Sequence, residues 1–92
     1  MALDDRQEEV LRAVMESLGN LTNTQVCESI LHHSANLRLR NGGHDAAVLS
    51  EFEAARDFAD QRQWIRGVRT STGRVRWSIT DLGRAALAEL NA

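Results

Sequence analysis

The basic side chains of this 92-residue chain are the residues whose type and position suggest a chemistry. All eleven are arginine, and six of them fall in residues 61–92, where two acids leave a net charge of +4. Residues 1–60 contain five arginines and eleven acids, a net charge of −6. A planar guanidinium donates paired hydrogen bonds to phosphate or carboxylate groups, so the basic third predicts an anionic partner. The overall charge of −2 argues against strong, indiscriminate binding of nucleic acid.

Cysteine and histidine do not form a recognisable metal site or catalytic set. Cys27, His32, His33 and His44 match no established zinc spacing, and Cys27 falls on the expected buried face of its helix. No serine, histidine and acid are spaced as a catalytic triad. Gly42-Gly43 lacks the lysine and the preceding strand of a phosphate-binding loop. We therefore predict no enzymatic activity, no metal and no cofactor.

Length and composition indicate one globular domain spanning residues 1–92. No apolar run approaches the roughly 20 residues that a membrane span needs, and the acidic N-terminus lacks the apolar core of a signal peptide. The single cysteine excludes an internal disulfide, which agrees with a reducing compartment. These features predict a cytoplasmic protein that does not associate with membranes.

The elements that must position the arginines begin with three predicted helices. Apolar residues at helical spacing predict the first helix over 5–18, with Gly19-Asn20 as its stop. A second helix is expected from Thr22, capped by Thr22 and Gln25, and its pattern fades at residues 32–33. Its expected buried face consists of Val26, Cys27, Ile30 and Leu31. The third follows a long connection, 34–44; it is capped by Asp45 and runs from residue 46 to 63. Its expected apolar positions are Val48, Leu49, Phe52, Ala55, Phe58 and Ala59.

The last third changes from helical to alternating periodicity. Strands are predicted over 64–70 and 74–79, joined by a turn at 71–73, and a final helix is expected to start at Thr80-Asp81. Trp77 alternates in step with Val75 and Ile79, which favours a core position over a stacking platform for bases. Arg74 and Arg76 lie on the opposite face of the same strand. The final helix is expected to bury Leu82, Ala86, Leu87 and Leu90.

Three parts of this region resemble MarR-like and PadR-like bacterial transcriptional regulators. They are the Trp64-Ile65 pair, Gly73-Arg74 in the hairpin, and the segment I-T-D-L-G-R-A-A-L at residues 79–87. The resemblance implies an α+β, mostly helical winged helix-turn-helix fold with three helices, a β-hairpin wing and a C-terminal helix. It also implies a DNA-binding transcriptional regulator that dimerises through its first and last helices. The short chain without lysine suggests a bacterial or phage origin. Two departures are Gln63, where the families usually have glycine, and the long connection before the third helix.

If the resemblance extends to function, the helix at 46–63 is the recognition helix and duplex DNA is the partner. Bases would be contacted from the start of that helix, and phosphates from the preceding loop and the wing. Arg74, at the tip of the wing, would enter a narrow minor groove. The expected base-contacting residues are His44, Asp45, Ala47 and Ser50, and the expected phosphate-contacting residues are Arg38, Arg40, Arg66, Arg69, Arg74 and Arg76.

The outward face of the same helix suggests an alternative function. At about 100° per residue, the outward positions include Glu53, Asp57, Asp60 and Gln61, and their carboxylates would be repelled by phosphate. A protein partner would fit this acidic face beside a basic hairpin, as in an antirepressor, an inhibitor or an assembly factor. If Arg66 and Arg76 pair with acids such as Asp57 or Asp60, the arginines of the wing form only a solvated strand face and contact no DNA. We expect no small-molecule inducer, since the sequence shows no ligand pocket.

Overall fold

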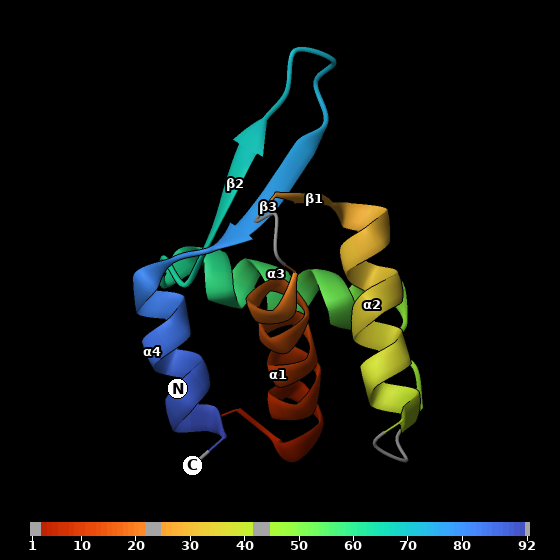
Figure 1. Cartoon of the computed structure of the whole chain (residues 1–92). Helices are drawn as coiled ribbons and strands as arrows, with labels where there is room; N and C mark the ends of the chain where they lie inside the picture. The colour runs from red at the N-terminus through yellow and green to blue at the C-terminus, as the bar shows by residue number, and fades with distance from the viewer. Residues whose placement is uncertain (1–2, 22–24, 42–44, 92) are drawn as a thin grey trace.

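The computed structural model describes residues 3–21, 25–41 and 45–91, and within them four helices surround an apolar core beside a small sheet (Figure 1). The sheet is antiparallel with strand order β1-β3-β2. The hairpin of β2 and β3 projects beyond the helices, and α1 lies between α2 and α4 (Figure 1). The mostly helical α+β class is confirmed. The elements are α1 (Asp5–Asn20), β1 (Val26–Cys27), α2 (Glu28–Asn41), α3 (Leu49–Gln61), β2 (Ile65–Arg69), β3 (Val75–Ile79) and α4 (Asp81–Leu90).

Helix α1 forms where its apolar pattern predicts. The carboxylate of Asp4 accepts a hydrogen bond from the Gln7 backbone N–H at 2.7 Å, and the Gln7 side chain accepts one from the Asp4 N–H. This capping box satisfies backbone donors that a helix start would leave free. The predicted end at residue 18 is two residues early, since the helix continues through Gly19 and Asn20. Leu21, whose backbone is extended, is the C-cap.

The second helical region differs from the expectation at its start. Val26 and Cys27 form strand β1 and pair with Trp77 and Arg76 of β3, instead of lying on a buried helix face. Pairing with a distant strand therefore overrides the local helical pattern. The expected cap at Thr22 lies outside the described residues.

The connection predicted over 34–44 is wrong for residues 34–41, which continue α2. Leu31, Ala35 and Leu39 follow one another at intervals of four, and all three are buried. This stripe includes a small alanine and is interrupted by polar residues, so its helical period was weak in the sequence. Ile30, expected on the buried face, is mostly exposed.

Helix α3 begins three residues later than predicted, and Asp45 does not cap it. Residue 47 is instead held against α2: the Ala47 N–H donates to the Asn36 side chain at 2.9 Å, and the Ala47 carbonyl lies 3.0 Å from His32 Nε2. The second contact occupies a carbonyl that, in a helix starting at residue 46, would accept the N–H of Glu51. The N-cap is Val48, and the helix ends at residue 61.

Gln63 adopts a left-handed backbone conformation with φ of 61°. This region favours glycine, because a side chain crowds the following carbonyl there. Gln63, at the position where the MarR-like and PadR-like families usually have glycine, therefore adopts a strained conformation that glycine would adopt freely. The turn into β2 keeps its geometry through the Thr80 hydroxyl, which donates to the Gln63 and Trp64 carbonyls.

The predicted hairpin is confirmed with slightly shorter strands. Ile65 pairs with Ile79, Gly67 with Trp77, and Arg69 with Val75. The tip closes with Gly73 at φ 84°, where a glycine is favoured. We call this hairpin, residues 65–79, the wing.

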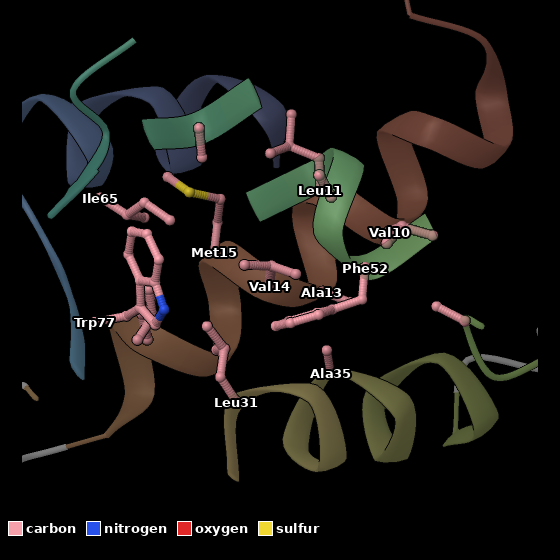
Figure 2. Packing of buried hydrophobic residues seen from close by; sticks show 14 of the residues in the cluster. Val10, Leu11, Ala13, Val14, Met15, Leu31, Ala35, Phe52, Ile65 and Trp77 are labelled. Carbon is pink, nitrogen blue, oxygen red and sulfur yellow. The ribbon is translucent and has the colours of Figure 1, made fainter. Parts of the chain in front are cut away.

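The core gathers side chains from α1, α2, α3 and the sheet (Figure 2). Phe52 of α3, Leu31 of α2 and Ile65 of β2 are fully buried. Trp77 is only 6% exposed, which confirms its predicted core position. Trp64 is half-buried and meets Phe58 edge-on, with ring centres 5.9 Å apart.

Helix α4 starts as predicted, with the Thr80 hydroxyl accepting the Gly83 N–H at 3.0 Å. Ala86, Leu87 and Leu90 are half-buried, but Leu82 is 58% exposed, so its predicted burial is wrong. None of the helices described here is long and apolar enough to cross a bilayer.

Candidate nucleic-acid interface

Seven of the eleven arginines fall into two groups. Those of the helices, with the exception of Arg40 and Arg84, are engaged by carboxylates. Arg66, Arg74 and Arg76 of the wing are exposed and form no ion pair within the part of the chain that the structure describes. The engaged pairs are Arg6–Glu51 (2.9 Å), Arg12–Glu8 (3.5 Å), Arg38–Glu16 (3.5 Å) and Arg56 with Glu28, Glu53 (3.9 Å) and Asp57 (2.9 Å).

The register of the wing places these three arginines on one face. Arg76 lies opposite Val68, and Arg66 lies opposite Ser78. The Thr70 N–H donates to the Arg74 carbonyl at 2.7 Å, which continues the same pairing to the tip. Because side chains alternate along a strand, all three project from the face opposite Trp77. The Cβ atoms of neighbouring arginines on this face are therefore about 7–8 Å apart.

The remaining wing arginine, Arg69, is on the other face and donates to the Gly73 carbonyl at 3.2 Å. It supports the hairpin tip. The pairing of Arg66 and Arg76 with Asp57 or Asp60, considered from the sequence, does not occur among the described residues.

Arg38 and Arg40 do not lie in a loop as predicted, but in the last turn of α2. Arg38 reaches Glu16 of α1, so its charge is engaged. Arg40 is exposed. The sequence missed this arrangement because the helical extension of α2 was not recognised.

The residues expected at the start of the recognition helix are placed differently from the prediction. Ala47 is only 5% exposed and belongs to the segment before α3. Ser50 is exposed in the first turn, and Asp45 is exposed ahead of the helix. His44 lies outside the described residues. The first turn instead exposes Val48 and Leu49, which were expected to be apolar core positions.

The acidic face of α3 is exposed, as its helical positions predict. Asp57, Asp60 and Gln61 are exposed and Glu53 is partly so. Arg56 partly neutralises this face from one side by pairing with Glu53 and Asp57. Asp60 has no ion pair in the described ranges. Negative charge therefore remains strongest toward the C-terminal end of the helix.

Cys27 is neither buried nor helical, contrary to its predicted position. It pairs in register with Arg76 and immediately precedes α2. The Ser29 hydroxyl at 3.3 Å, together with the backbone N–H of Ile30, lowers the pKa of the thiol. The sequence did not predict that Cys27 lies beside the arginine face of the wing, because about 50 residues separate Cys27 from Arg76.

A groove of about 560 Å³ lies between the first half of α1 and the exposed side of α3. Val10, Leu11 and Phe58 supply apolar lining, and Gln7 and Gln61 supply polar lining. Two helices about 40 residues apart form it, so the sequence did not indicate it. The expectation that no small molecule binds stays a prediction.

Comparisons with known proteins bear on the fold. No protein-family model matches the sequence, and no curated protein matches it. The structure is similar to that of SSV1 F-93, with a TM-score of 0.63 and 17% identity over 91% of this chain and 80% of that one. It is also similar to Cdc6p from Pyrobaculum aerophilum, with a TM-score of 0.69 and 15% identity over 97% of this chain. The match spans 24% of the Cdc6p chain. The resemblance to MarR-like and PadR-like regulators stays a prediction, whereas the predicted winged helix-turn-helix fold is confirmed.

Proposed function

We propose that this protein binds duplex DNA and acts as a transcriptional regulator. The observation that carries the proposal is the face formed by Arg66, Arg74 and Arg76, whose guanidinium groups have no carboxylate partner in the described structure. Unneutralised arginines at regular spacing suit contact with the phosphates of a duplex. The winged-helix fold supports this use, because its wing and third helix commonly contact DNA together.

The charge on α3 limits how the helix can approach a duplex. Asp57 and Asp60 would meet phosphates if the full length of the helix entered a groove. The first turn has no outward charge, since its one acid, Glu51, is engaged by Arg6. We therefore propose that the start of α3 faces the bases while its acidic end is lifted away.

Binding of a fluorescent random-sequence duplex at low and moderate salt tests this function. We expect measurable affinity at low salt that falls steeply with salt, because phosphate contacts release counterions. Arg76→Ala should weaken binding and lower the salt slope by about one. Arg84→Ala, which removes the same charge from an exposed position on α4, is the matched control and should change the slope little. Absence of binding at low salt would refute the proposal.

A second candidate function is a protein-binding module. The exposed acids Asp57 and Asp60 and the partly exposed Glu53 favour it, because an acidic helix beside a basic hairpin suits a partner with complementary patches. An antirepressor, an inhibitor or an assembly factor would use such a surface. If no duplex binds at low salt and charge reversal at Asp60 abolishes a protein complex, this function replaces DNA binding.

We also propose a homodimer formed through α1 and α4, as the resemblance implies. The two helices pack together, since a Cβ atom at Gly19 of α1 would lie 3.1 Å from Leu87 of α4, and α4 lies on the side of α1 away from α2 (Figure 1). A dimer would present two third helices to successive turns of a duplex. Light scattering at micromolar concentration should give twice the chain mass of 10.3 kDa, and a monomeric mass would refute the dimer.

A further inference from the structure

Two large apolar side chains stand exposed at the start of α3. Val48, the N-cap residue, and Leu49, the first helical residue, are each 60% exposed. They are adjacent in the chain, unlike Ile30, Leu37 and Leu82, the other strongly exposed large apolar residues among those that the structure describes. Burial of either side chain against a partner would be favourable, so this pair is a candidate contact surface.

The backbone under the pair is held in place. The Val48 N–H donates to Glu51 Oε1 at 3.2 Å, and Arg6 binds the Glu51 carboxylate through two nitrogens at 2.9 and 3.2 Å. The same guanidinium donates to the carbonyls of Asp45 at 3.0 Å and Ala46 at 3.3 Å. Residues 45–51 are thereby fastened to α1, and the apolar pair is presented on a fixed scaffold.

Charge along α3 determines which partner the pair can meet. The acids Glu53, Asp57 and Asp60 follow the first turn. Arg56 pairs with the first two, whereas Asp60 has no ion pair among the described residues, so the end of the helix is least able to approach a polyanion. The first turn exposes Val48, Leu49 and Ser50, which carry no charge. The part of the helix that can enter the major groove is thus the part that presents apolar groups.

The apolar group that the major groove displays is the C5-methyl of thymine. We propose that Val48 and Leu49 contact thymine methyl groups, which would give this protein a preference for thymine at the bases facing the start of α3. The exposed hydroxyl of Ser50 would meet a neighbouring base edge. This inference rests on the proposed DNA binding and deepens it by naming the base feature that is read.

The test compares two duplexes that differ only in the methyl groups: a short alternating A·T duplex and the same duplex with deoxyuridine in place of thymidine. We expect the unmodified protein to bind the thymidine duplex more tightly, by about fourfold for each methyl group that is buried. The double variant Val48→Ala/Leu49→Ala should bind both duplexes equally. Leu37→Ala, an exposed leucine of α2, is the control and should keep the preference.

The outcomes separate this inference from the proposed function. Equal binding of both duplexes by the unmodified protein would overturn the methyl contact and leave DNA binding intact. A preference that survives in the double variant would also overturn it. Failure to bind either duplex would refute DNA binding itself. If the double variant instead converts a dimer into a monomer, the pair is a contact between two copies of the chain and the inference is wrong.

Discussion

The guanidinium of Arg56 in α3 lies 5.6 Å from the centre of the Trp77 ring in β3. The indole N–H of Trp77 donates to Glu28 at 3.3 Å, and the same carboxylate pairs with Arg56. A cation above an aromatic ring and a shared carboxylate thus join α3, the start of α2 and the base of the wing. This contact sets the wing relative to the third helix, and both belong to the proposed interface.

Replacing Arg56 with methionine should destabilise the protein. The side chain is 15% exposed, and its loss leaves Glu28, Glu53 and Asp57 close together without a cation. We expect the free energy of unfolding to fall by about 1–3 kcal/mol. Urea denaturation measures this fall, and near-UV circular dichroism reports the surroundings of Trp77. Arg84→Met is the control, and equal stability of the two variants would contradict the prediction.

Replacing Asp60 with asparagine should strengthen DNA binding. The Asp60 carboxylate is exposed near the end of α3 and has no ion pair among the described residues. Removing one charge at a screened distance from phosphate should raise the affinity about twofold at low salt. Fluorescence anisotropy gives the affinity, with Glu89→Gln on α4 as the control. A decrease in affinity would mean that Asp60 makes a favourable contact with a base.

Gly83 of α4 is expected to tolerate no side chain. A Cβ atom there would lie 1.9 Å from the Trp64 carbonyl oxygen, which is backbone and cannot move aside cheaply. Alanine in a helix normally gains about 1 kcal/mol over glycine, but this clash should outweigh the gain and lower the melting temperature strongly. At Gly19 in α1, the nearest atom is the flexible end of Leu87 at 3.1 Å. Gly19→Ala should therefore be close to neutral, and an equal loss in both variants would contradict the explanation.

Acid should weaken the attachment of the segment before α3. The hydrogen bond from Arg6 lowers the pKa of Glu51 below its ordinary value of 4.5, and the Val48 N–H adds to the effect. A carboxyl group with a lower pKa in the folded state stabilises the fold above its unfolded pKa, and this contribution disappears as pH falls through the folded pKa. Urea denaturation at decreasing pH should therefore show a loss of stability below about pH 4.5, the unfolded value. Glu51→Gln should reduce that loss, and Glu89→Gln should leave it unchanged.

The thiol of Cys27 should react faster in the folded protein than in the unfolded chain. Hydrogen bonds from the Ser29 hydroxyl and from the Ile30 N–H lower its pKa, which raises the thiolate fraction at neutral pH. Alkylation by iodoacetamide, followed by mass spectrometry with and without urea, compares the two states of the one cysteine. Ser29→Ala should slow the folded reaction. A folded rate equal to or below the unfolded rate would contradict the expected thiolate stabilisation.

The sequence alone determined the parts of this protein whose signals are local. Three such signals are the apolar stripe of α1, the cap at Thr80 and the alternation around Trp77. Each depends only on residues that are close together in the sequence. Such patterns predict an element because neighbouring side chains must share one face to be buried together. The exposed acids of α3 followed from the same reasoning, because helical geometry places them opposite Phe52 and Ala59.

Tertiary structure decided the features that join distant segments. Strand β1 exists because Val26 pairs with Trp77, and α3 starts late because Ala47 bonds to α2. It also decided which arginines remain available, since the partner of Arg6 lies 45 residues away in sequence. Composition counts charges, but only packing determines which of them meet. The helices engage most of their arginines with carboxylates, and the projecting wing leaves three without one in the described structure, because no acidic side chain reaches its outer face.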